Sequence, residues 1–176
     1  MSARIRARLV GIAIVSVLGA CSTTTPSPSA AGSDVHSYPS PTGVTLTAVT
    51  DVEILPQTEA AILAAFDAES AAALVASVPA GLDFAESGLI CVYLGERSTG
   101  GWSLALQSAS VVNGELQILA REGRPPASGG PAGTTYPAGC GTITRAGLPT
   151  GTVSARADDT VSEEFIVSGT ITVPGS

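Results

Sequence analysis

Apolar and polar residues alternate along the chain after residue 43, and the period of the pattern changes from segment to segment. Residues 44–55 alternate Val or Leu with Thr, which favours a β-strand, and Pro56 ends it. Between Thr58 and Val78 the apolar residues recur near helical spacing in an Ala-rich segment. We therefore predict a helix here, capped by Thr58 and packed on a sheet.

From residue 88 onward the pattern becomes that of strands. Residues 89–94 are apolar on both faces, as in a strand covered on both sides. Residues 102–107 alternate, and residues 111–119 contain Asn113-Gly114, which suits the type I′ turn of an antiparallel hairpin. A Pro/Gly-rich loop over residues 121–133 precedes further strand-like runs at residues 134–136, 140–145, 151–157 and 165–173. The pattern predicts an α+β fold, mainly β, with one helix packed on an antiparallel sandwich or barrel-like sheet of about six short strands.

Residues 1–20 have the architecture of a cleavable secretory signal peptide. Three arginines and no acidic residue precede an apolar run at residues 9–18, and the small residues Gly19 and Ala20 follow it. A helix over that run would be about 15 Å long, roughly half the thickness of a hydrocarbon core. It is therefore too short to remain as a spanning anchor.

The segment Leu18-Gly19-Ala20-Cys21 resembles the lipobox of bacterial lipoproteins, in which the signal peptide is cut before an invariant Cys. The resemblance implies that Cys21 is lipidated, which anchors the protein to a membrane on its extracytoplasmic face, in the cell envelope. Whether that membrane is inner or outer stays open. The alternative is a secreted protein in which Cys21 has no role. Residues 21–43 then form a Ser/Thr/Pro-rich tether, and residues 44–176 form a single β-rich domain.

The charge of the mature chain limits the classes of partner. The chain has no Lys, three of its eight arginines lie in the predicted signal peptide, and all fifteen acidic residues lie after it. Five arginines against fifteen acidic residues give the mature chain a net charge of −10. This charge argues against nucleic acid and against adhesion to anionic lipid through a basic patch.

Two cysteines remain once Cys21 is assigned to the lipid. In an oxidising compartment Cys91 and Cys140 are expected to form a disulfide, and the alternative is two separate buried thiols. Closing a loop of about fifty residues would stabilise the fold by roughly 4 kcal/mol, because the disulfide lowers the conformational entropy of the unfolded chain. Neither cysteine has the neighbours or the spacing of a redox or metal site.

The residue types of the domain exclude most catalytic mechanisms. The single His, His36, lies in the tether, so a Ser/His/Asp triad, a Cys/His pair and a lysine nucleophile have no candidates within the domain. Asp158-Asp159 and Glu163-Glu164 could supply oxygen ligands, but their spacing is not that of an EF-hand, and a solvated hairpin tip accounts for them. We expect no enzyme activity, catalytic residue, metal, cofactor or small-molecule substrate.

The most distinctive stretch runs from residue 92 to residue 104. A strand ends at Gly95, a polar turn carries Arg97, Ser98 and Thr99, and Gly100-Gly101 allows a new strand to begin at Trp102. This stretch resembles the C-terminal domain family of PrcB, a protease complex subunit, whose pattern places a basic residue and Thr-Gly-Gly-aromatic between two strands. The similarity covers residues 89–145, about a third of the chain, and includes the hairpin turn, Arg124-Pro-Pro126 and Thr135-Tyr-Pro137.

The resemblance implies a non-catalytic lipoprotein that binds and stabilises an exported protease. The candidate partner-binding residues are Arg97, Ser98, Thr99, Gly100, Gly101 and Trp102. This chain departs from the family pattern at Ser98, where Pro is frequent, at Trp102, where Tyr is usual, and at the Cys140 strand, which has no counterpart. The alternatives are a protease inhibitor and a passive envelope protein without a specific partner.

A purely structural role for the same residues competes with partner binding. Trp102 shares a strand face with Leu104 and Leu106, which predicts a ring in the core, and Gly100-Gly101 can serve only to make a tight turn. If the stretch contacts a partner, Arg97 and Thr99 are the expected contact residues because a turn tip exposes them.

Overall fold

The computed structural model describes residues 44–175, which form ten strands and one short helix. This confirms the predicted α+β class, mainly β. The elements are β1 (Leu46–Val49), β2 (Ala60–Ala65), α1 (Ala68–Ala72), β3 (Ser87–Leu94), β4 (Arg97–Thr99), β5 (Ser103–Val112), β6 (Glu115–Gly123), β7 (Ala132–Thr135), β8 (Ala138–Thr144), β9 (Gly151–Asp159) and β10 (Phe165–Val173). The ten strands outnumber the six expected in part because β2 lies in the segment predicted as a helix and β4 lies in the segment predicted as a turn.

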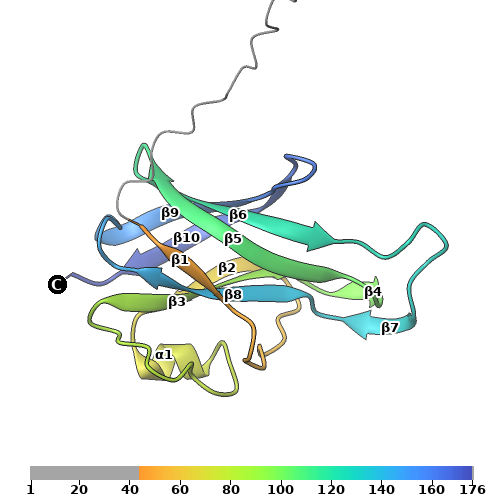
Figure 1. Ribbon diagram of the computed structural model, residues 1–176, viewed down its shortest axis with the longest axis horizontal. Helices are drawn as coiled ribbons and strands as arrows, with labels where there is room; N and C mark the ends of the chain where they lie inside the picture. The colour runs from red at the N-terminus through yellow and green to blue at the C-terminus, as the bar shows by residue number, and fades with distance from the viewer. Residues whose placement is uncertain (1–43, 176) are drawn as a thin grey trace, which may run out of the picture. The chain divides into compact units, whose positions relative to one another are not determined.

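Two four-stranded sheets, in the orders β1-β8-β3-β2 and β10-β9-β6-β5, lie face to face (Figure 1). The predicted sandwich is therefore present. The main core lies between the sheets and includes Ile90, Val92, Leu116, Ile118 and Ile143, all fully buried. Within these two sheets the one exception to the predicted antiparallel pairing is β6 with β9, which are parallel because the chain passes through β7 and β8 before it returns to β9.

A second core covers the outer face of the sheet that contains β3. Here α1 and the loops beside it pack on Leu89, Cys91 and Tyr93, which are buried. Strand β3 is therefore covered on both faces, as its unbroken apolar run predicted. Burial also raises the pKa of Tyr93 to about 12, and the Tyr93 hydroxyl donates a hydrogen bond to the carbonyl oxygen of Leu74, 3.4 Å away.

The predicted helix over residues 58–78 is wrong outside Ala68–Ala72. Ala60–Ala65 forms β2, which pairs antiparallel with β3 so that Ile62 lies opposite Val92. The helix is confined to Ala68–Ala72 and is capped by Asp67 rather than by Thr58, with the Asp67 carboxylate accepting the N–H of Ser70 at 2.7 Å. The apolar spacing near Ile62 fits either structure, and pairing with a buried strand outweighs the helical preference of alanine.

The predicted hairpin at Asn113-Gly114 is confirmed. Both residues have positive φ, 53° and 81°, as a type I′ turn requires, and the turn joins β5 to β6 antiparallel.

Cys91 and Cys140 form a disulfide. They lie opposite each other on β3 and β8. The pairing expected from the cysteine count is therefore present, and the bridge lies within the second core.

The predicted signal peptide, the lipidation site at Cys21 and the tether lie outside the described residues. Among residues 44–175, no helix combines the length and the apolar character needed to cross a bilayer.

Candidate functional site

The stretch selected from the sequence forms a strand rather than a turn tip. Arg97–Thr99 is β4, which pairs antiparallel with β7 as a two-stranded ribbon. The ribbon continues the β3–β8 pair, to which it is joined by a hydrogen bond from Leu94 N–H to the carbonyl oxygen of Pro137 at 2.9 Å. It lies at the end of the sandwich away from the start of β1 (Figure 1). The expected exposure is only partly found, because Ser98 is exposed whereas Arg97 and Thr99 are half-buried.

The two glycines after β4 allow close packing against the Pro/Gly-rich loop. The N–H of Gly100 donates to the carbonyl oxygen of Pro131 at 2.7 Å. Gly101 has φ +89°, and a Cβ there would lie 3.2 Å from the Cβ of Pro125. A Cβ on Gly130 would overlap the carbonyl oxygen of Gly100. The Gly-Gly pair therefore has a structural role, to bring the loop onto the ribbon.

Trp102 is held between the core and the ribbon. Its ring is half-buried and packs against the main core, on the side of buried Leu104 and Leu106. Its Nε1 donates to the hydroxyl oxygen of Thr99 at 3.3 Å. The guanidinium of Arg97 covers the ring, with Cζ 5.3 Å from the centroid, in a cation–π contact. The structural role and the partner-binding role predicted for Trp102 are therefore both compatible with its position. Part of the ring packs in the core, and part faces a cleft.

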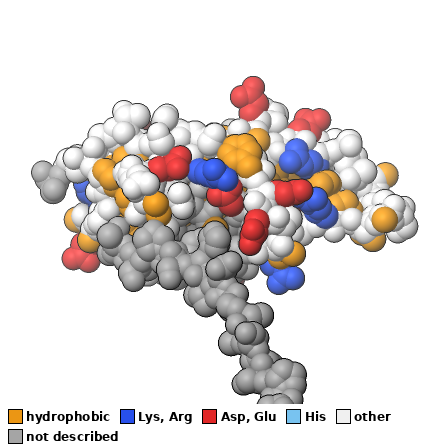
Figure 2. All heavy atoms as spheres, turned by 90° about the horizontal axis from the view of Figure 1, so that it is seen from above, with side chains coloured by type: hydrophobic (Ala, Val, Ile, Leu, Met, Phe, Trp, Pro, Cys, Tyr) orange, Lys and Arg blue, Asp and Glu red, His pale blue; other side chains and the backbone are white. Residues whose placement is uncertain are grey.

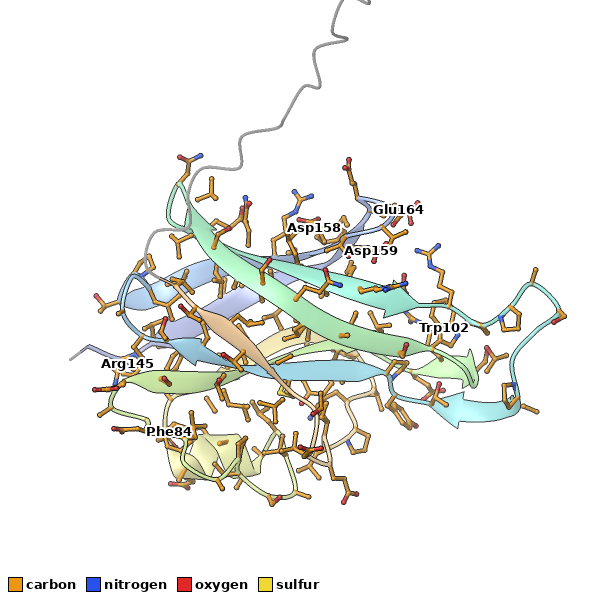
Figure 3. All side chains as sticks on the ribbon, viewed as in Figure 1. Phe84, Trp102, Arg145, Asp158, Asp159 and Glu164 are labelled. Atoms are coloured by element: carbon orange, nitrogen blue, oxygen red, sulfur yellow. A yellow bond between two sulfur atoms is a disulfide. The ribbon has the colours of Figure 1, made fainter. Side chains whose placement is uncertain are left out.

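The cleft has a volume of about 310 Å³ and lies between β4 and the β9–β10 hairpin. Figure 3 shows Trp102 toward the ribbon and Asp159 and Glu164 at the hairpin. The lining residues are Leu94, Arg97, Trp102, Glu122, Arg124, Asp159, Glu164, Phe165 and Ile166. The fold therefore joins two segments that the sequence analysis treated separately, the Arg97–Trp102 stretch and the acidic hairpin.

Arg124 links the loop to the hairpin. Its guanidinium lies 2.9 Å from the carboxylates of both Glu122 and Glu164. Hydrogen bonds to Glu164 and Glu122 raise the pKa of Arg124 above its usual value. Arg97, by contrast, has no ion pair within the described part of the chain, and its Nη1 reaches only the carbonyl oxygen of Glu96 at 3.4 Å.

Asp159 is not a solvated residue, contrary to the expectation for the acidic hairpin. It is buried, and its carboxylate accepts hydrogen bonds from Glu122 N–H at 3.0 Å and from Ser162 N–H and Oγ at 2.8 and 2.7 Å. These bonds, led by that from Glu122, lower the pKa of Asp159 to about 2. Asp158 pairs instead with Arg156 at 2.7 Å. The carboxylates of Asp158, Asp159 and Glu164 thus bond to other groups of the domain.

The hairpin also exposes apolar side chains. Val161 at its tip is 71% exposed, and Phe165 at the start of β10 is 56% exposed. The guanidinium of Arg156 lies over the Phe165 ring at 5.6 Å. Figure 2 views the molecule from above Figure 1 and shows basic and acidic side chains intermingled with hydrophobic ones on that face.

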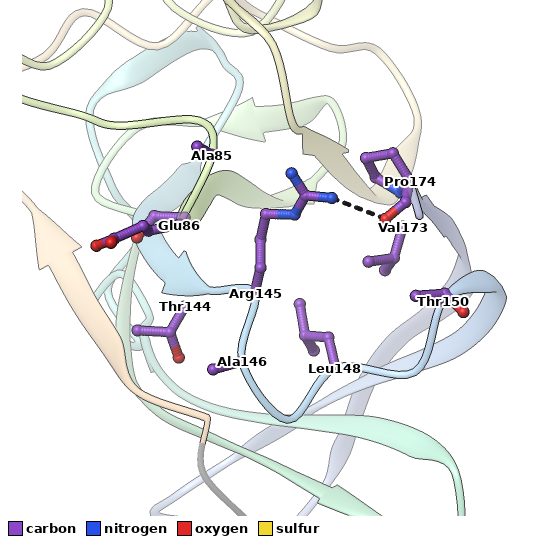
Figure 4. Close-up of a pocket in the computed structure, with 10 residues that line it drawn as sticks. Ala85, Glu86, Thr144, Arg145, Ala146, Leu148, Thr150, Val173 and Pro174 are labelled. Carbon is purple, nitrogen blue, oxygen red and sulfur yellow. Dashed lines mark hydrogen bonds between the residues drawn. The ribbon is translucent and has the colours of Figure 1, made fainter. Parts of the chain in front are cut away.

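A larger cavity of about 490 Å³ surrounds Arg145 at another part of the domain (Figure 4). The guanidinium of Arg145 donates to the carbonyl oxygens of Phe84 at 3.1 Å and of Pro174 at 2.8 Å. It also lies 6.0 Å from the centroid of the Phe66 ring. Arg145 therefore links three chain segments. These contacts explain the position of its side chain, and no ligand is needed to explain it.

No protein-family model, no curated protein and no solved structure matches this chain. The resemblance to the PrcB family accordingly stays a prediction from the motif.

Sequence reasoning missed Arg124, Glu122 and Phe165 as parts of the site. Arg124 stood in the Pro/Gly-rich loop and Phe165 at the start of a strand, and neither position carries a local signal for a cleft. An aromatic residue directly after an acidic hairpin was the one available hint of an exposed ring.

Proposed function

We propose that this chain is a non-catalytic envelope lipoprotein whose domain docks on an exported protease. The proposed docking face consists of Arg97, Trp102, Arg124 and Phe165, which line one cleft. Arginine and aromatic side chains are enriched at protein interfaces and at their energetic centres. The observation that carries the proposal is that the motif resembling PrcB forms one wall of this cleft.

The geometry suits binding with little reorganisation. Trp102 is already fixed by Thr99 and by the cation–π contact with Arg97, so less side-chain entropy is lost when a partner covers it. Phe165 is more than half exposed, and burying its remaining surface against a partner would favour association.

The disulfide supports the proposed location. A bridge between Cys91 and Cys140 persists in an oxidising compartment, which agrees with export by the predicted signal peptide. Lipidation of Cys21 would then keep the domain at the membrane, at the end of the predicted tether of residues 21–43.

The test is a crosslinking pull-down of the full-length chain from its own cells, with bound proteins identified by mass spectrometry. Trp102→Ala and Arg97→Ala are the test variants, and Arg121→Ala is the matched control because Arg121 is exposed on β6 and does not line the cleft. We expect a recurrent protease with the wild type and with Arg121→Ala, and its loss with the two test variants. Far-ultraviolet circular dichroism and denaturant unfolding confirm that each variant is folded.

Two results would oppose the proposal in different ways. Equal recovery of a protease with Trp102→Ala and with Arg121→Ala would show that the protease does not bind at the proposed docking face. Recovery of no protease, under conditions that capture known envelope complexes, would show that the chain does not bind a protease.

A second candidate function is direct inhibition of a protease by the loop over residues 124–131. Pro126, Ala127, Ser128 and Gly129 are exposed, while hydrogen bonding at Pro131 and packing at Pro125 hold both ends of the loop. Loops held at both ends by a scaffold are suited to binding. A concentration-dependent slowing of the purified protease, lost when residues 126–129 are replaced by Gly-Ser linker, would favour inhibition over stabilisation.

A further inference from the structure

The outer edge of β4 has no strand partner among the described residues. The ribbon contains two strands, β4 and β7, and no other strand of the described chain joins it. Its continuation, β3, is covered on both sides by β2 and β8. An open edge presents main-chain N–H and C=O groups to which another chain can bond.

The pairing with the β2 segment ends at Glu96, just before β4 begins. The pairing of β2 with β3 stops at Ala60 opposite Leu94, and one further bond runs from Glu96 N–H to the carbonyl oxygen of Thr58 at 3.0 Å. Pro56 lies two residues before Thr58 and has no N–H with which to continue the ladder.

The side chains of β4 indicate the chemistry of an added strand. Two arginines line the cleft. Arg124 contacts the carboxylates of Glu122 and Glu164, whereas Arg97 has no carboxylate partner within the described residues. The nearby carboxylate of Glu96 is instead the acceptor of the Tyr136 hydroxyl at 3.3 Å. In adjacent strands, residues of opposite charge that lie directly across from each other attract. An acidic side chain opposite Arg97 would complete this pairing.

We propose that β4 accepts an extended segment of the partner as a third strand of the ribbon, with an acidic residue of that segment opposite Arg97. Main-chain bonds to the β4 edge supply the attachment, and Arg97 with Trp102 selects the side chains that face the cleft. This inference rests on the proposed docking function and names the form of the partner at that face.

The experiment places a photo-crosslinking amino acid in the full-length chain in its own cells. The test position is Ser98, on the open edge of β4, and the matched control is Thr134, which is also exposed but lies on the other strand of the ribbon. Crosslinked peptides are sequenced by mass spectrometry. Arg97→Glu is then combined with the crosslinker at Ser98, alone and together with an acidic-to-arginine change in the captured segment.

We expect Ser98 to capture one segment containing an acidic residue, at a yield well above that from Thr134. Arg97→Glu should lower the yield roughly five- to tenfold, and the reciprocal change in the partner should restore it. Capture of the partner with equal yield from both positions, or a yield unchanged by Arg97→Glu, would overturn strand addition while leaving docking intact. Absence of a captured protein at both positions, together with no recurrent protease in the pull-down, would overturn both proposals.

Discussion

The carboxylate of Asp159 accepts a hydrogen bond from the backbone N–H of Glu122, 3.0 Å away, and so joins the end of β9 to the end of β6. Its second oxygen accepts from the N–H and the hydroxyl of Ser162. One buried carboxylate thereby fixes both the hairpin loop and the strand that leads to Arg124. The shape of the cleft depends on this residue, although Asp159 itself need not touch a partner.

The first prediction concerns the pH dependence that Asp159 imposes. Its pKa in the folded protein is about 2, below the ordinary value of 3.8. A lowered pKa means that the stabilisation is fully present above about pH 4 to 5 and is lost as the pH falls through the range from 3.8 to 2. Asp159→Asn should therefore reduce the free energy of unfolding at pH 7 by about 2 kcal/mol, and the difference from wild type should shrink at pH 2.5.

Denaturant unfolding at both pH values measures this effect, and Asp158→Asn is the control. Asp158 contributes an ion pair with Arg156, whose side chain is 44% exposed, so its loss should change stability by no more than about 1 kcal/mol. A difference between wild type and Asp159→Asn that is constant from pH 7 to pH 2.5 would contradict the assignment.

The disulfide gives the second prediction. Cys91 and Cys140 close a loop with a sequence separation of 49, so replacing both with Ala should lower the free energy of unfolding by about 4 kcal/mol. Because both residues are buried, a thiol reductant should act slowly on the native protein and quickly once denaturant is added. Denaturation curves with and without reductant test the stabilisation by the bridge, and the rate of reduction with and without denaturant tests its protection. Equal midpoints for the two curves, with complete reduction verified by mass, would show that the bridge does not stabilise the fold.

The third prediction tests the packing of the loop on the ribbon. A Cβ on Gly130 would overlap the carbonyl oxygen of Gly100, so Gly130→Ala must displace the loop and should cost about 1–3 kcal/mol. Trp102 is the only tryptophan in the chain and lies next to this contact, so its fluorescence should change as well. Gly175→Ala is the control because nothing lies within 4 Å of its added Cβ. Matching fluorescence and stability for the two variants would refute the packing role.

Local patterns were sufficient for some parts of the fold. The β5–β6 hairpin followed from Asn113-Gly114 because the required positive φ is a property of those two residues. The burial of β3 on both faces followed from its unbroken apolar run. In the case of β2, the sequence pattern was ambiguous, and pairing with β3 decided the outcome.

The cleft could be predicted only in part, because its two walls come from distant segments. The stretch beginning at Arg97 was selected by its motif, but Phe165 reaches the same cleft through the register of β10 on β9. Likewise, the burial of Asp159 depends on the parallel pairing of β6 with β9, which places Ala120 opposite Asp159. No local pattern encodes a contact of this kind.

The last prediction concerns Cys21, on which the proposed location depends. If Cys21 carries two or more acyl chains, the mature protein should enter the detergent phase in a phase-partition assay and should incorporate labelled fatty acid. Cys21→Ala should abolish both, because the variant lacks the thiol that would carry the acyl chains. The domain should remain folded in this variant because residues 44–175 contain both cores.

The matched control for the anchor is Ser22→Ala, which alters the neighbouring residue and keeps the thiol. It should partition and label like the wild type. Detergent-phase partition that persists in Cys21→Ala would contradict the lipobox resemblance, and a wild-type protein found in the culture medium without label would favour plain secretion. The docking test with Trp102→Ala remains valid in either case, because it depends on the folded domain rather than on how the domain is held at the membrane.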